Sequence, residues 1–330
     1  MSPNAPSTHP NSPPNAVFPR GLASSSRSRR VGLVVAFAIS ILTLVCLPAV
    51  ADEDELDLDD QNEYKSAARL DQELSLEEID QQLNNPLTSL WSLTLQENMS
   101  LKRGSDFRGT KTSNTLFFQP ALPIPLQKGR TFIARPVIPL VTAPVPDKTS
   151  PGETDGSETG LGDIQLLSLY GPDKAKGLTW GIGPTFKFPT ASDDLLGSGK
   201  WQAGPAAMIL NLGEKWTTGA IIQHWWSFAG DDDRPATSQT DLQYIFRRKL
   251  PGAMSIGMGP TMTIDWEADD DNRVTLPIGL GITKTIRLGK MPLKVRFEPQ
   301  YSLIKPDDFG TTWNFRFQIT PVIPSPFAKK

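Results

Sequence analysis

Residues 177–188, with the sequence GLTWGIGPTFKF, alternate between two kinds of side chain at every second position. One set is apolar: Leu178, Trp180, Ile182, Pro184, Phe186 and Phe188. The other set is small or polar: Thr179, Gly181, Gly183, Thr185 and Lys187. A period of two predicts a β-strand with two unlike faces. Residues 254–266 and 293–303 repeat the pattern, so the chain is built from such strands.

Working outward from this stretch, alternating segments recur about twelve times, separated by Gly, Pro and charged residues. They lie at residues 89–100, 111–121, 130–141, 161–170, 177–188, 200–211, 215–228, 238–248, 252–266, 274–287, 292–304 and 311–321. Two architectures fit. A soluble sandwich turns its apolar faces inward, whereas an outer-membrane barrel turns them toward lipid.

Strand length and the connections favour the barrel. Trp216 and Trp226 share one face, and at ~3.3 Å per residue and a tilt of ~40° they are roughly 25 Å apart along the barrel axis. The connections alternate between long and short, and the longer ones include Lys102–Gly109 and Ala143–Gly160. An even number of strands puts both termini on the periplasmic side. The sequence therefore predicts an all-β, transmembrane, antiparallel up-and-down barrel of about twelve strands at 87–330.

The first 51 residues have the layout of a secretory signal peptide. Arg27, Arg29 and Arg30 precede an apolar run over 31–45, and Ala49-Val50-Ala51 offers a cleavage site. We expect cleavage after Ala51. The less favoured alternatives are an uncleaved anchor over 31–50 and a lipoprotein attached through Cys46. No later stretch has about 18 consecutive apolar residues, so the exported chain is not expected to cross a membrane by helices.

Residues 52–86 form an acidic linker followed by a short amphipathic helix. Seven acidic residues lie within 52–60. A helix is expected over 70–83, where Ser75 and Glu78 fit a capping box and Leu76, Ile79 and Leu83 share a face. The favoured interpretation is a helix resting on the end of the barrel, and the alternative is a periplasmic plug or latch.

Several segments together resemble one bacterial family: GLGDIQLLSLYGP (160–172), WGIGPTFKFPTASDDLLGSGKWQAGPAA (180–207), HWWSFAGDDDR (224–234), TIDWEA (263–268), LPIGLGITK (276–284) and WNFRFQITPVIP (313–324). The family is the outer-membrane β-barrel transporters often labelled "neuromedin U", which is similar to the proteins of the MetA pathway of phenol degradation. The resemblance implies a channel in the cell outer membrane for small solutes, aromatic ones among them. Barrels of this kind end on an aromatic residue that the assembly machinery reads, whereas here Phe327 is followed by three further residues.

Composition excludes several classes of protein. A net charge of −3 and a pI of about 5.6 argue against nucleic-acid binding. One cysteine and two histidines exclude a disulfide framework and a multi-histidine metal centre. Barrel phospholipases need a His-x-Ser pair, but His224 is followed by Trp225, Trp226 and Ser227. We expect no enzyme activity, no cofactor and no dedicated metal site.

The polar strand faces supply the candidate functional residues. Those expected to line the lumen are Arg135, Lys187, Lys294, Arg296, Glu298 and Arg316, and those expected in an aromatic girdle are Trp180, Trp216, Trp226, Trp266 and Trp313. The cationic surplus predicts a mildly positive, porin-like channel for small solutes. Alternatives are a non-conducting structural or binding barrel and, less favoured, a soluble sandwich. Expected partners are outer-membrane lipid, lipopolysaccharide and the barrel-assembly machinery. Acidic loops could bind divalent ions at the lipopolysaccharide surface.

Overall fold

The computed structural model describes residues 75–84, 90–126, 129–174 and 176–323, which form one antiparallel sheet and two short helices. The predicted signal peptide, the acidic linker and Phe327 lie outside the described residues. The elements are α3 (Leu76–Gln82), β1 (Trp91–Gly104), β2 (Phe107–Leu126), β3 (Arg130–Pro146), β4 (Thr154–Leu161), β5 (Ile164–Pro172), β6 (Gly177–Phe188), β7 (Lys200–Leu212), β8 (Trp216–Gly230), β9 (Ser238–Leu250), β10 (Met254–Met258), β11 (Thr261–Asp265), the 3-10 helix η1 (Asp270–Asn272), β12 (Val274–Gly279), β13 (Gly281–Leu288), β14 (Met291–Ile304) and β15 (Gly310–Ile323).

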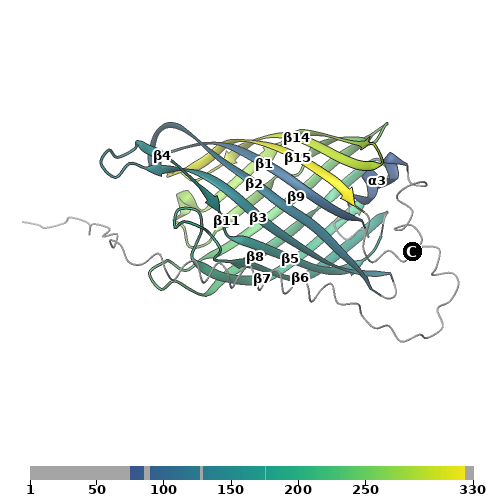
Figure 1. Cartoon of the computed structure of the whole chain (residues 1–330), viewed down its shortest axis with the longest axis horizontal. Coiled ribbons are helices and arrows are strands. Elements are labelled where there is room, and N and C mark those ends of the chain that lie inside the picture. Colours follow the sequence, from purple (N-terminus) through teal and green to yellow (C-terminus); the bar gives the residue numbers. More distant parts are fainter. Residues whose placement is uncertain (1–74, 85–89, 127–128, 175, 324–330) are drawn as a thin grey trace, which may run out of the picture. The chain divides into compact units, whose positions relative to one another are not determined.

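The fifteen strand segments make a closed barrel of twelve spans, as predicted (Figure 1). Three spans are each interrupted once, between β4 and β5, between β10 and β11, and between β12 and β13. Each span pairs with the next along the chain, and β15 pairs with both β14 and β1. The last pairing sets Leu95 opposite Ile319 and closes the sheet on itself.

Two expected loops are instead hairpins. The connection predicted at Lys102–Gly109 shrinks to Ser105-Asp106, because the strands continue on both sides. The backbone N–H groups of Ser105 and Asp106 donate to carbonyls of Asp307 and Asp308, which fixes this turn. The loop predicted at 143–160 contains the end of β3 paired with β4, and this hairpin extends beyond the neighbouring strands (Figure 1). Backbone pairing beyond the apolar alternation accounts for both differences.

The apolar strand faces point outward. On β6 the side chains of Leu178 and Ile182 are 58% and 56% exposed, whereas Thr185 on the opposite face is fully buried. On β14 the same division separates exposed Phe297 from buried Lys294. A soluble sandwich would bury its apolar faces, so that alternative is wrong. Exposed apolar faces around a closed sheet are the arrangement of a transmembrane barrel.

The interior is not polar throughout, contrary to the expectation that polar faces line it. One wall carries a buried apolar cluster on β3, β5, β7 and β8. Its members are Ile133, Leu167, Leu169, Ala206, Met208, Leu210 and Ile221. These strands place apolar side chains on both faces over part of their length, which a two-residue period does not reveal. The cluster fills part of the barrel between the mid-height of the strands and the α3 end.

The break between β10 and β11 has a clear physical cause. Pro260 has no N–H to donate to the ladder. The preceding residue, Gly259, turns its backbone groups to the interior. Its N–H donates to Glu298 Oε1 at 2.9 Å, and its carbonyl accepts from Arg316 Nη1 at 2.8 Å. A Cβ on Gly259 would lie 2.8 Å from Arg247 Nη2, so glycine leaves the room that this cluster needs.

Helix α3 begins at a capping box and lies at the end of the barrel where β13 and β14 meet (Figure 1). The Glu78 N–H donates to Ser75 Oγ at 3.2 Å, and Ser75 N–H donates to Glu78 Oε2 at 2.8 Å. Ile79 packs in a buried cluster with Leu90 and Val322. Residues 70–74 of the expected helix lie outside the described range. Among the described residues, no helix is long and apolar enough to span a membrane.

Candidate functional site

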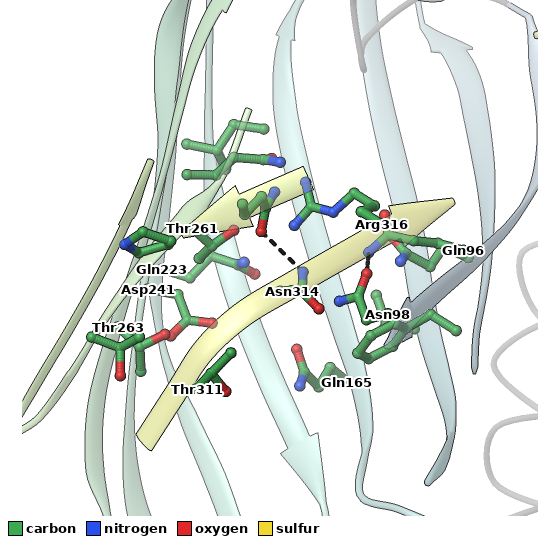
Figure 2. A pocket seen from close by; sticks show the side chains of 18 of the residues that line it. Gln96, Asn98, Gln165, Gln223, Asp241, Thr261, Thr263, Thr311, Asn314 and Arg316 are labelled. Carbon is green, nitrogen blue, oxygen red and sulfur yellow. Dashed lines mark hydrogen bonds between the residues drawn. The ribbon is translucent and has the colours of Figure 1, made fainter. Parts of the chain in front are cut away.

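The barrel encloses a central chamber of about 350 Å³, which its strands line from both sides (Figure 2). In the figure, Gln223, Asp241, Thr261 and Thr263 lie on one side, and Gln96, Asn98 and Gln165 lie on the other. Side-chain amides are the most frequent lining group: Gln96, Asn98, Gln119, Gln165, Gln223, Gln243, Gln300 and Asn314. Amides both donate and accept hydrogen bonds, so the chamber can solvate a small polar solute without water.

Three charged groups line the chamber. Arg135 on β3 donates to Gln119 Oε1, and Arg316 on β15 donates to the Gly259 carbonyl. Asp241 on β9 accepts from Gln239 Nε2 at 2.7 Å. The lining described here thus carries two guanidinium groups and one carboxylate, a net positive charge. Two of the predicted lumen residues, Arg135 and Arg316, therefore share one cavity.

The apolar cluster bounds part of this chamber. Leu167 and Ile221 belong both to the cluster and to the chamber lining. Phe117 and Val137 add to the apolar part of that lining. Other cluster residues, such as Leu169 and Leu210, lie further toward the α3 ends of the strands. The chamber therefore has a mixed surface, apolar on one part and amide-rich on the rest.

Arg296 and Glu298 form a buried ion pair beside the chamber. Arg296 Nε donates to Glu298 Oε2 at 2.8 Å, and Arg296 Nη1 donates to Thr283 Oγ1 at 2.9 Å. Glu298 is completely buried. Glu298 also accepts from the Gly259 N–H, so each oxygen of its carboxylate has a partner. These two predicted lumen residues bond to each other, and neither appears in the chamber lining.

Lys294 lies two residues nearer to the α3 end on the same face of β14, and α3 covers it. Its Nζ is 3.2 Å from Asp80 Oδ1 and donates to Asn84 Oδ1 at 2.7 Å. Thr285 Oγ1 on β13 donates to the same Asp80 oxygen at 2.8 Å. The predicted lumen residue Lys294 is thus bound by side chains that come from outside the barrel strands.

Lys187 lines a second cavity of about 340 Å³ at the loop end. Its Nζ donates to Gln239 Oε1 at 3.0 Å and lies 4.0 Å from the centroid of the Trp225 ring. Asp163 and Asp265 line the same cavity. The loop end of the interior is therefore more acidic than the chamber.

The five tryptophans predicted for the girdle are exposed on the outer surface. Trp180 and Trp216 lie near the α3 ends of β6 and β8, where Arg130 and Arg248 lie over their rings at 5.6 and 5.9 Å. Trp226, Trp266 and Trp313 lie near the loop ends. Tryptophans therefore lie at both ends of the strands, which is where membrane barrels carry aromatic residues.

His224 contacts a tryptophan ring and a threonine hydroxyl. It lies on the outer face, where its ring centroid is 4.0 Å from that of Trp226 and its Nδ1 is 2.7 Å from Thr240 Oγ1. Over the described residues, His, Asp and Glu side chains form no group of three that could hold a metal ion.

Sequence reasoning missed two features of the interior. It did not find the amide lining, although the amides lie on the polar faces of the alternating segments, with Gln96 and Asn98 two residues apart, and could have indicated it. It also missed Asp80 and Asn84, whose signal was a polar pair four residues apart beside the apolar Ile79 and Leu83.

Residues 94–284 match the family described as "Putative MetA-pathway of phenol degradation". The chain belongs to this family. Membership agrees with the predicted resemblance, and it covers the strands from β1 into β13. The comparison with curated proteins finds no match.

Three solved structures of bacterial proteins are similar to this member of the family. An outer membrane channel from Pseudomonas putida F1 is 16% identical with a TM-score of 0.51, over 71% of this chain and 95% of that one. The β domain of the Bordetella autotransporter BrkA is 15% identical with a TM-score of 0.40, over 70% and 99%. A FadL homologue from Pseudomonas aeruginosa is 7% identical with a TM-score of 0.34, over 71% and 90%. The first likeness shows a shared barrel fold.

Proposed function

We propose that the protein is an outer-membrane channel that passes small polar solutes through its central chamber. The observation that carries this proposal is the amide-lined cavity inside a closed barrel whose outer face is apolar. Such a wall is stable in lipid because closed pairing satisfies its backbone groups. The similar structure from Pseudomonas putida is titled an outer membrane channel, which agrees with this assignment.

The proposed channel has a mild preference for anions. Arg135, Arg316 and Asp241 line the chamber, which leaves one positive charge uncompensated among the described lining residues. A fixed charge in a narrow passage lowers the barrier for ions of opposite sign. Arg296 and Lys294 add little, because carboxylates pair with both.

Location in the outer membrane is part of the same proposal. It requires export by the signal peptide expected at 1–51 and insertion by the barrel-assembly machinery. The exposed tryptophans at both ends of the strands support it, since outer-membrane barrels carry aromatic girdles at both lipid interfaces. Lipid and lipopolysaccharide would then be the partners of the outer surface and of the loops.

A non-conducting barrel is the second candidate, and one observation favours it. The buried cluster around Leu169 and Leu210 and the helix α3 together occupy space toward the α3 end. A barrel filled there would pass no solutes. It would instead bind a ligand at its loops or have a structural role in the cell envelope.

Conductance of the refolded protein in planar bilayers decides between the two candidates. A channel gives discrete current steps, and its reversal potential in a tenfold KCl gradient lies on the anion side of zero. Absence of steps in the parent protein and in a Leu210→Ala variant, which widens the filled region, would instead support the non-conducting barrel.

A further inference from the structure

The α3 end of the barrel interior contains a site that already holds a carboxylate. Lys294 Nζ on β14 and Thr285 Oγ1 on β13 both contact Asp80 Oδ1, at 3.2 and 2.8 Å. All three residues are buried. A cation and a hydroxyl that converge on one oxygen are what a carboxylate needs when it leaves water. The barrel supplies the donors, and the acceptor comes from α3.

The segment that carries α3 supplies a further partner for Asp80. Asn84, one turn further along the chain, donates to Asp80 Oδ2 at 3.3 Å and also accepts from Lys294. The apolar contacts of the helix involve Ile79, Leu90 and Val322. Within the described residues, α3 contacts mainly β13 and β14, and Glu77 and Glu78 remain exposed. A seven-residue helix has little stability of its own, so its position depends on these contacts.

We propose that Lys294 and Thr285 form a carboxylate-binding site on the solute path, and that Asp80 occupies this site as a tethered competitor while α3 closes the barrel. A solute that bears a carboxylate displaces Asp80, and α3 then moves away from β13 and β14. This inference rests on the proposed channel function and adds the chemical class of the solute.

The effective concentration of the tethered Asp80 carboxylate sets the solute concentration at which competition occurs. A group on a short flexible tether has an effective concentration in the mM range. A free carboxylate whose intrinsic affinity for Lys294 equals that of Asp80 would therefore displace Asp80 at mM concentrations. Chloride is a single atom and has no second oxygen to accept from Asn84, as Asp80 does, so it competes less well. The solute shifts the equilibrium only because it binds the open state alone.

The test records single-channel currents of the full-length protein in KCl, with sodium acetate added on the α3 side. For the wild type we expect the open fraction to rise with acetate, half-maximally at mM concentration, and not with added NaCl. The Asp80→Asn variant keeps the shape of the side chain and removes its charge. We expect it to be open in KCl alone and insensitive to acetate.

Glu77→Gln is the matched control, because it removes an exposed carboxylate from the same helix. It should behave as the wild type does. Lys294→Gln should lose the response to acetate. If that variant fails to fold, Thr285→Val takes its place, because it leaves every charge in place, and it should weaken the response several-fold. Equal open fractions in wild type and Asp80→Asn, or equal responses to acetate and chloride, would overturn the proposal.

A binding measurement separates failure of this inference from failure of the channel function. Calorimetry with acetate in detergent should detect binding to Asp80→Asn and none to Asp80→Asn combined with Lys294→Gln. Binding without current steps would reject the channel and keep the carboxylate site. Current steps with no acetate binding in Asp80→Asn would keep the channel and reject the site.

Discussion

Arg296 Nε lies 2.8 Å from Glu298 Oε2, and the two residues are neighbours on the inner face of β14. Residues two apart on a strand point the same way, so this ion pair forms within one strand. Glycines on the adjacent spans make room for it, since a Cβ on Gly281 would lie 2.7 Å from Glu298 Cβ. The pair is therefore a structural element of the wall, and its charges cancel.

Glu298→Gln should strongly destabilise the barrel. The change leaves the buried Arg296 guanidinium without a counter-charge, which typically costs about 3–5 kcal/mol. Urea unfolding of the refolded protein, followed by tryptophan fluorescence, measures the loss. Glu267→Gln in the connection after β11 is the control, because that side chain is exposed. A loss below about 1 kcal/mol for Glu298→Gln would show that the pair is not needed.

Arg135→Gln combined with Arg316→Gln should move the reversal potential toward cations. Both guanidinium groups line the chamber, and their removal leaves Asp241 as its charged group among the described residues. The shift should shrink in about 1 M salt, where screening reaches only roughly 3 Å. Lys290→Gln, which removes an exposed cation from the turn before β14, should leave the potential unchanged. An unchanged potential in a conducting double variant would contradict the positive chamber.

Ile222→Arg should impair assembly more than Thr261→Arg. Ile222 is exposed on the outer face near the middle of β8, and a cation at mid-bilayer costs about 2–4 kcal/mol. Thr261 lines the chamber, where a long cation can reach water. Thr185 would be a poor substitute for this control because it is fully buried and bonded to Gln223 and Trp225. Folding yields on unheated gels compare the two variants, and equal yields would mean that the faces are assigned wrongly.

Glu97→Leu should stabilise the barrel, because it removes an acidic residue from the lipid face. We expect a gain of about 1 kcal/mol, since an acidic residue there costs less than a basic one. Glu97 lies mid-strand on the outer face of β1, opposite Leu116 and Phe317. Its Oε1 has no hydrogen-bond partner among the described residues. Urea unfolding in detergent micelles and in lipid vesicles checks the gain. Glu97→Gln should gain less, and a destabilised Glu97→Leu would indicate that a partner binds this carboxylate.

Acid should loosen α3. The Ser75 backbone N–H, and then the Ser75 hydroxyl, hold the pKa of Glu78 below its usual value of 4.5, with a smaller contribution from Lys176. A lowered pKa means that the cap contributes at neutral pH and is lost as the pH falls through the folded-state pKa. A spin label on Glu77→Cys, with Cys46 replaced by Ser, should become more mobile as the pH falls through the lowered pKa of Glu78. Glu78→Gln should remove this pH dependence, and persistence of the dependence would assign it to another group.

The sequence alone predicted the barrel because each strand carries its own evidence. The alternation at Leu178 and Thr179 sets two faces, and the tryptophan spacing in β8 gives the height of the lipid band. Interior pairing was out of reach because it joins distant residues. The Asp80–Lys294 contact links positions separated by most of the folded chain, and no local pattern encodes it. The apolar wall was missed since Leu166 and Leu167 are alike in type yet lie on opposite faces.

The seam between β1 and β15 gives the barrel a completion point during its biogenesis. The first strand has no final neighbour until the last one has been made, and unpaired edges bind other chains. The socket for α3 is assembled from both sides of that seam, since Ile79 packs against Leu90 just before β1 and Val322 at the end of β15. Docking of α3 can therefore follow only after closure, so a docked helix marks a barrel whose sheet is complete.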